Sequence, residues 1–189
     1  VAMLVEISPE QNSLVGDILA SMFSVESGDY TTAVDENGII LIKSLEPDQD
    51  YDDIRNIADT IVDMMSTEAM LNVRVAFGTI VQELKDVSKS YKEAMMALEV
   101  GRVFYGESRV AAYNNLGIGR LIYQLPENLC HMYVEEILGR DHTQFDEETV
   151  TTVNTFFENS LNISETSRQL YVHRNTLVYR IEKLQKQTG

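Results

Sequence analysis

The first 113 residues alternate between short apolar runs and amphipathic stretches. Residues 1–8 form an apolar run closed by Ser-Pro, which predicts a buried strand. Within 29–44, two stretches rich in β-forming residues flank the pair Asn37-Gly38, and Asn-Gly favours the tight turn of a hairpin. Further strands are expected at 72–80, turning at Gly78, and at 109–113.

Three segments between these strands carry apolar residues at helical spacing. Amphipathic helices are therefore predicted within 9–24, 50–70 and 83–102, and Gly101 is expected to cap the third. The side chains expected to face the core are Leu14, Ile18, Leu19 and Met22, then Ile54, Ile57, Ile61 and Met65, then Leu84, Val87, Tyr91, Ala94 or Met95, and Leu98. This order of elements predicts an α+β domain at 1–113, with helices packed on an antiparallel or mixed sheet.

Strand signals stop after Tyr113, so residues 114–189 are expected to be all-α. Apolar helical segments at 116–125 and 127–138 are followed by a polar connector at 140–145. Asp146 is the expected N-cap of a helix at 147–160, in which Val150, Val153, Phe156 and Phe157 would face inward. Two last segments, 164–170 and 174–187, are separated by three residues, which predicts a helix-turn-helix at about 163–187.

The spacing of apolar residues assigns a buried and an outer side to this helix-turn-helix. The packed side consists of Leu170, Val172, Leu177, Ile181 and Leu184, resting on Phe156, Phe157, Leu161 and Ile163. The outer side of the recognition helix, about 174–187, then carries Arg174, Asn175, Val178, Tyr179 and Glu182 and would lie in the major groove of double-stranded DNA.

Arg near the start of such a helix can bond guanine in a bidentate manner, and Asn can bond adenine in the same way. The residues placed to hold phosphates are Ser164, Thr166, Thr176, Arg180 and Lys183. For His173 two roles remain open, as the cap of the last helix and as a phosphate contact at its positive dipole end.

Charge is distributed unevenly along the chain. The 189 residues have a formal net charge of −15, which disfavours a molecule that binds nucleic acid over its whole surface. Residues 163–189, however, hold five basic and two acidic side chains, whereas 1–162 hold 10 basic and 28 acidic ones. This asymmetry indicates a nucleic-acid-binding end on an acidic body.

Cysteine content and hydropathy point to a cytoplasmic protein. Cys130 is the one cysteine, so an intramolecular disulfide is excluded and a reducing compartment is the simple inference. No apolar run approaches the roughly 18 residues of a spanning helix, and no secretory signal is visible, so no membrane partner is expected. The chain starts at Val1, which suggests a fragment of a longer protein.

The C-terminal motif resembles that of a known family. The run His173 to Leu177, followed by Tyr179-Arg180 and Thr188-Gly189, is similar to the C-terminal helix-turn-helix of PucR/CdaR-type bacterial transcription regulators, a module related to the DNA-binding tail of Fis. The segment 89–101, KSYKEAMMALEVG, is similar to a helix of the GGDEF-like domain of that family. The resemblance implies a degenerate GGDEF-like domain at 1–113, a helical connector with a helix-turn-helix at 114–189, and an upstream sensor domain for a small-molecule effector.

The sequence gives little support for a catalytic or a metal-binding function. Active diguanylate cyclases carry paired glycines on the hairpin turn, but 34–38 read Val-Asp-Glu-Asn-Gly, so no enzyme activity is expected. His131, His142 and His173 are scattered without zinc spacing, and the acidic run 48–53 lacks the pattern of a calcium loop. We therefore expect no metal and no cofactor.

The leading interpretation is a sequence-specific DNA-binding transcription regulator acting as a homodimer. One helix-turn-helix buries little surface, and two copies on neighbouring half-sites would give useful affinity. The alternative is a ligand-sensing or protein-interaction module whose helix-turn-helix serves in dimer packing.

Overall fold

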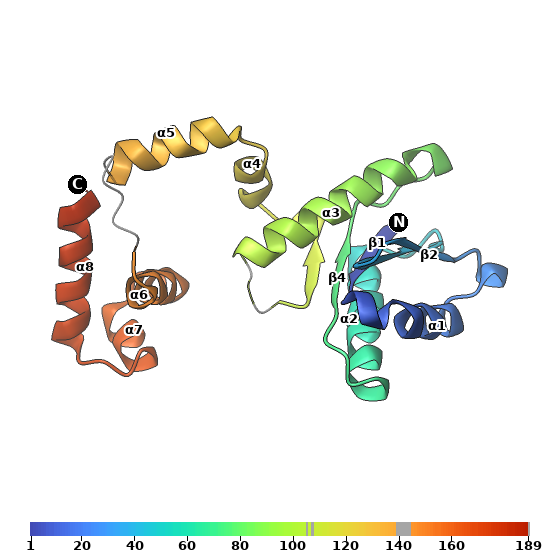
Figure 1. Cartoon of the computed structure of the whole chain (residues 1–189), viewed down its shortest axis with the longest axis horizontal. Helices are drawn as coiled ribbons and strands as arrows, with labels where there is room; N and C mark the ends of the chain where they lie inside the picture. Colours follow the sequence, from blue (N-terminus) through green and yellow to red (C-terminus); the bar gives the residue numbers. More distant parts are fainter. Residues whose placement is uncertain (105, 107, 139–144, 189) are drawn as a thin grey trace. The chain divides into compact units, whose positions relative to one another are not determined.

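The chain divides into two compact units, an N-terminal unit, Val1–Gln124, and a C-terminal unit, Leu125–Gly189 (Figure 1). The computed structural model describes residues 1–104, 106, 108–138 and 145–188. The domain boundary expected between residues 113 and 114 stays a prediction. The N-terminal unit continues through helix α4, Gly119–Tyr123, which packs beside the preceding helix.

The N-terminal unit is built on a five-stranded sheet of order β2-β3-β1-β4-β5. β1 is central and runs antiparallel to both neighbours, with Leu4 opposite Ile40 on β3 and Ala76 on β4. β4 and β5 pair in parallel. The strand bounds are Ala2–Glu6, Tyr30–Asp35, Gly38–Ile42, Arg74–Phe77 and Val110–Ala112. Every predicted strand is present, and the α+β class is confirmed.

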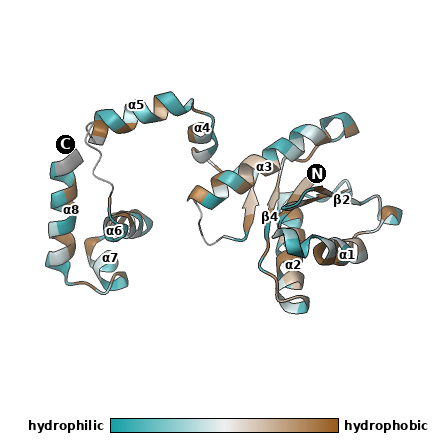
Figure 2. Ribbon diagram, in the orientation of Figure 1, coloured by the Kyte–Doolittle hydropathy of each residue, from teal (hydrophilic) through white to brown (hydrophobic). Residues whose placement is uncertain are grey.

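Helices cover both faces of this sheet (Figure 1). On one face, α1, Asn12–Met22, and α2, Tyr51–Glu68, close a core that includes Leu19, Ile61 and Phe77. On the other face α3, Val87–Phe104, packs through Ala94, Ala97 and Leu98. The residues of β1 and β3 are almost all apolar and buried, as expected for strands covered on two sides. Along α2, hydrophobic and hydrophilic residues are mixed, as expected for an amphipathic helix (Figure 2). Short 3₁₀ turns lie at Pro9–Gln11, Val25–Ser27, Leu84–Asp86 and Tyr113–Asn115.

Some of the residues predicted to face the core are exposed instead. In α1 the buried residues are Val15 and Leu19, while Leu14 is 49% exposed. Leu84 precedes α3 and is exposed. Of the two alternatives left open in α3, Ala94 is buried and Met95 faces outward. Small residues occupy the inner face of α3 because this helix lies close to the sheet.

Gly101 does not cap α3, contrary to expectation. The helix continues to Phe104 with Gly101 buried inside it. A Cβ at this position would lie 3.0 Å from the Cβ of Ala111, so the glycine allows close approach of helix and strand.

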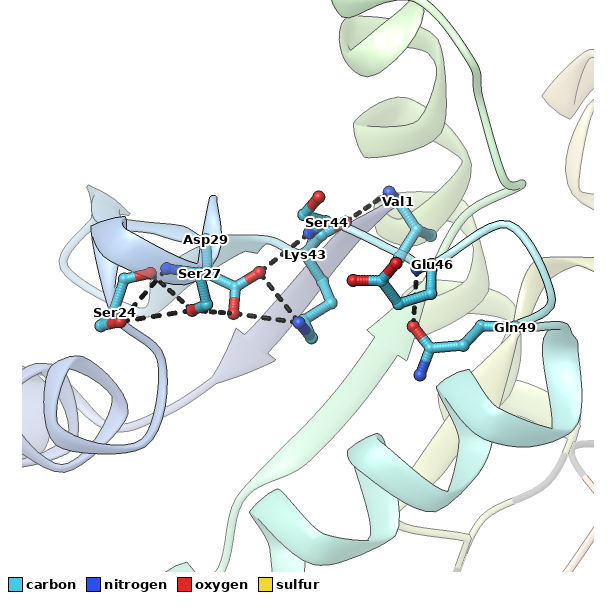
Figure 3. A network of polar contacts seen from close by, with 8 residues as sticks. All are labelled: Val1, Ser24, Ser27, Asp29, Lys43, Ser44, Glu46 and Gln49. Atoms are coloured by element: carbon cyan, nitrogen blue, oxygen red, sulfur yellow. Dashed lines mark hydrogen bonds and ion pairs between the residues drawn. The ribbon is translucent and has the colours of Figure 1, made fainter.

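A buried carboxylate fixes the outer hairpin at its open end (Figure 3). Asp29, 2% exposed, accepts hydrogen bonds from the Lys43 ammonium at 3.0 Å and from the backbone N–H of Ser44 at 2.9 Å. The Ser27 hydroxyl donates to the same carboxylate at 3.1 Å. The start of β2 is thereby tied to the end of β3, a structural role for this charged cluster.

The C-terminal unit contains α5, Glu127–Leu138, α6, Glu147–Glu158, α7, Ile163–Gln169, and α8, Arg174–Thr188. Its all-helical character is confirmed for the residues that the structure describes. Residues 140–144 of the predicted connector, which include His142, lie outside the described residues. None of the described helices is both long and apolar enough to cross a membrane.

Candidate nucleic-acid interface

The first helix of the helix-turn-helix has well-formed ends. The Asn162 side chain accepts from the N–H groups of Ser164 and Glu165 at 3.0 and 3.2 Å, which caps the N-terminus of α7. At the other end, the N–H of Tyr171 donates to Arg168 O at 3.2 Å and that of Val172 donates to Ser167 O at 3.0 Å. This pair of bonds is a Schellman motif and sets the turn into α8.

Tyr171 takes the position in this motif that glycine usually occupies. Its φ is 54°, in the left-handed region, and its side chain is 96% exposed. A bulky residue in this conformation is strained. From the sequence, Tyr171 could be placed only in the turn, because apolar spacing carries no signal for a residue outside both helices.

His173 caps the recognition helix. Its Nδ1 accepts from the backbone N–H of Asn175 at 3.2 Å, which satisfies one of the free donors at the start of α8. This contact shows the capping role. The imidazole is exposed, and the phosphate contact stays a prediction.

The buried residues of α6 are threonines, while the predicted inward residues Val153 and Phe156 are only partly buried. Thr152 and Thr155 are buried, and their hydroxyls donate to carbonyls of their own helix at 2.7 and 2.8 Å. The predicted inward residues Val150, Phe157 and Leu161 are instead 46%, 68% and 54% exposed. A small side chain that satisfies its hydroxyl on its own helix permits closer packing than a phenylalanine does. Leu177 on α8 is fully buried, as expected.

The prediction that Thr166 holds a phosphate is wrong. It is completely buried on the packed side of α7, and its hydroxyl has no hydrogen-bond partner among the described residues. Thr166 and Ser167 face the interior on α7. Of the two residues of this helix that were predicted to hold phosphates, only Ser164 is exposed.

Arg180 was also expected to hold a phosphate, but the structure places it against α6. Its guanidinium donates to the Glu148 carboxylate at 2.5 Å and to the Thr152 hydroxyl at 3.3 Å, and its side chain is 25% exposed. These groups line a pocket of about 360 Å³ together with Leu170 and Val172. Arg180 therefore joins α8 to α6. Glu148, which no pattern in the sequence marked, supplies the counter-charge.

The same end of α6 is stabilised by an ionised cap. Asp146 accepts from the backbone N–H of Thr149 at 2.8 Å. Hydrogen bonds from Thr149 lower the pKa of Asp146, with the side chain contributing more than the backbone. The positive charges of Lys183 and Arg180 lower this pKa further. Asp146 is confirmed as the N-cap of this helix.

The outer side of α8 leaves most of the predicted DNA-contacting residues free. Arg174, Asn175, Thr176, Tyr179 and Lys183 are exposed, and Val178 is partly buried. Asn175, Tyr179 and Lys183 follow one another at intervals of four and so share one stripe of the helix. Within the described part of the chain, Arg174 and Lys183 form no ion pair, and the side-chain amide of Asn175 makes no hydrogen bond. This surface offers a guanidinium, an amide and an ammonium at the start and along one side of a capped helix.

The hairpin turn of the N-terminal unit carries no comparable site. Residues 34–37 are exposed, and the Asp35 carboxylate accepts from the backbone N–H of Asn37 at 2.8 Å, an interaction that shapes the turn. No group of three or more metal-ligating side chains occurs among the described residues.

Comparison with known protein families matches both units. A model of the GGDEF-like domain matches residues 1–100, and a model of the PucR C-terminal helix-turn-helix domain matches residues 149–189. The first match alone covers more than half of the 189 residues.

Three curated bacterial proteins are similar over most of the chain. The purine catabolism regulatory protein of Bacillus subtilis is 28% identical over 155 residues, covering 80% of this chain and 29% of that protein. The DNA-binding transcriptional activator AdeR of the same organism is 29% identical, covering 80% and 37%, respectively. The carbohydrate diacid regulator of Escherichia coli is 26% identical, covering 74% and 37%. The chain thus spans about a third of the length of these relatives.

A crystal structure of a regulator of polyketide synthase expression from Bifidobacterium adolescentis aligns with this chain. The alignment covers 100% of this chain and 71% of the chain in that crystal structure, with 16% identity and a TM-score of 0.37.

The family assignment rests on the two domain matches, which agree with the motif around His173 and with the observed folds of both units. The chain belongs to the PucR/CdaR-type family of bacterial transcription regulators, with a GGDEF-like domain followed by a PucR-type helix-turn-helix.

Proposed function

We propose that this chain binds specific DNA sequences through α8 and regulates transcription as part of a longer cytoplasmic protein. The observation that carries the proposal is the pair Arg174 and Asn175, exposed at the capped start of α8 while Leu177 anchors the opposite side in the interior. An arginine and an asparagine at the start of a helix are suited to guanine and adenine edges in the major groove.

The remaining exposed residues have distinct roles in this proposal. Ser164, Thr176 and Lys183 hold phosphates, and the free N–H groups at the start of α8 add to the attraction for an anion. Val178 and Tyr179 contribute apolar contact with the groove. Thr166 and Arg180 take no part in DNA contact, because one is buried and the other is paired with Glu148.

The GGDEF-like domain serves as a scaffold without catalysis. Its hairpin turn lacks paired glycines, and the related proteins are regulators of transcription. Two copies of the chain bind two half-sites, and a small-molecule effector acts through a part of the protein upstream of this chain. Incubation with GTP and Mg²⁺ tests the first point, and formation of a cyclic dinucleotide would contradict it.

A selection experiment tests the proposed function. The chain is incubated with fragments of bacterial genomic DNA, and bound fragments are recovered and sequenced. We expect a shared motif, with an affinity that falls as salt rises because phosphate contacts release counterions. Recovery of fragments without a shared motif, or an affinity that does not respond to salt, would favour the alternative in which the helix-turn-helix serves in dimer packing.

A further inference from the structure

Glu182 is an acidic residue on the side of α8 that faces DNA in the proposed function. It follows Asn175 by seven residues and Val178 by four, so it lies on the same outer side of the helix, two turns beyond Asn175. Its side chain is exposed, whereas Leu177 on the inner side is fully buried. None of the DNA contacts in the proposed function involves this carboxylate.

The Glu182 carboxylate has no partner within the described part of the chain. Lys186 stands one turn further along α8, at the spacing of a helical ion pair, yet no ion pair joins the two side chains. Glu165 of α7, by contrast, lies 2.7 Å from the guanidinium of Arg168. The Glu182 carboxylate can therefore accept hydrogen bonds from a partner outside the chain.

A carboxylate on a surface that faces DNA discriminates strongly between base pairs, because it only accepts hydrogen bonds. It repels the phosphates, and in the major groove it also repels the N7 and O6 acceptors of guanine and the O4 acceptor of thymine. The amino group of adenine lies between two acceptors of its base pair. The amino group of cytosine has an acceptor on one side only, so cytosine is the base edge that best fits a carboxylate.

We propose that Glu182 makes the chain selective for a cytosine, whose N4 amino group donates to the Glu182 carboxylate. The inference rests on the proposed function, in which Asn175 contacts an adenine in the major groove. Seven residues of helix rise by about 10 Å, which equals about three stacked base pairs. The cytosine therefore lies about three base pairs from that adenine, toward the C-terminal end of α8. At other base pairs the carboxylate meets acceptors, and this repulsion lowers the affinity for incorrect sequences.

Selection from double-stranded oligonucleotides of random sequence tests this role on the chain 1–189 and on Glu182→Ala. We expect the motif of the unaltered chain to contain the cytosine, and the motif of Glu182→Ala to accept any base at that one position. In fluorescence anisotropy, replacing the cytosine of the selected site should weaken binding of the unaltered chain about tenfold and leave binding of Glu182→Ala nearly unchanged. The affinity of Glu182→Ala for scrambled DNA should rise, because the substitution removes a negative charge.

Glu158→Ala is the matched control, because it removes an exposed carboxylate from the end of α6 in the same unit. This variant should keep the preference for cytosine, and its loss would show an effect of net charge and overturn the assignment. A motif of the unaltered chain without that cytosine, or the same motif from Glu182→Ala with the cytosine retained, would also overturn it. Failure of the proposed function is distinguishable, because the unaltered chain would then recover no shared motif at all.

Discussion

The guanidinium of Arg180 on α8 donates to the carboxylate of Glu148 on α6 at 2.5 Å, and this ion pair sets the recognition helix against the helix behind it. The partly buried Arg180 also reaches the Thr152 hydroxyl, so one arginine contacts two residues one turn apart on α6. A basic residue in a DNA-binding motif thus has a partner within the protein.

Arg180→Ala should therefore reduce stability more than DNA affinity. We expect the free energy of unfolding of the C-terminal unit to fall by about 1–2 kcal/mol, a value kept small because Glu148 is largely exposed. Urea unfolding followed by far-UV circular dichroism measures this change. Glu148→Gln is the informative companion, because an increase in DNA affinity would show that Arg180 is a phosphate ligand restrained by its partner.

Thr166→Val should stabilise the protein or leave its stability unchanged. The Thr166 hydroxyl is buried without a hydrogen bond in the described part of the chain, and valine has the same shape without the polar group. The free energy of unfolding should rise by between zero and about 1 kcal/mol. DNA affinity should not change, and a clear loss of affinity would mean that the hydroxyl turns outward to a phosphate.

Tyr171→Gly should relieve backbone strain in the turn. Glycine adopts a φ of 54° freely, whereas tyrosine does not, so we expect a gain of about 1 kcal/mol in unfolding free energy. Tyr171→Ala removes the same side chain but keeps the strain, and it serves as the matched control. Equal stability of the two variants would show that the conformation costs little.

The ionised Asp146 cap should make the C-terminal unit sensitive to acid. The pKa of Asp146 is lower in the folded state than in the unfolded chain, where it is about 4. The ionised carboxylate therefore adds to the free energy of unfolding above that unfolded pKa, and this contribution is lost as the pH falls through the folded pKa. Asp146→Asn retains a good cap but does not titrate. Thermal unfolding of both proteins between about pH 3 and pH 7 should show a smaller acid-side decrease for the variant. Parallel curves would contradict this role.

The sequence predicted the elements well because their signals are local. Hydrophobic period, the Asn37-Gly38 turn and the cap at Asp146 each act within a few residues of the element they define. The motif around His173 located the helix-turn-helix and its exposed side.

The sequence could not predict how closely the elements pack. In α6 the larger hydrophobic side chains Val150 and Phe157 suggested the inner side, but close packing placed Thr152 and Thr155 there. For the same reason Gly101 lies within α3 against Ala111 rather than at its end. Thr166 lies at helical spacing from Ile163 and Leu170 on the packed side of α7, so the spacing did encode its burial and only the polar hydroxyl suggested an outward role. The pairing of Arg180 with Glu148 depends on how α8 meets α6, which residue spacing does not encode.

The most direct test of the central claim compares two arginine variants on a DNA fragment recovered by selection. Arg174→Ala removes the proposed base contact, and Arg55→Ala removes an exposed arginine of the same charge from α2 in the N-terminal unit. Fluorescence anisotropy on the selected fragment and on a scrambled one should show a loss of about 1–3 kcal/mol of sequence preference for Arg174→Ala. Arg55→Ala should behave like the unaltered chain. Equal sequence preference in Arg174→Ala and the unaltered chain would contradict the assignment of α8 as the helix that reads DNA.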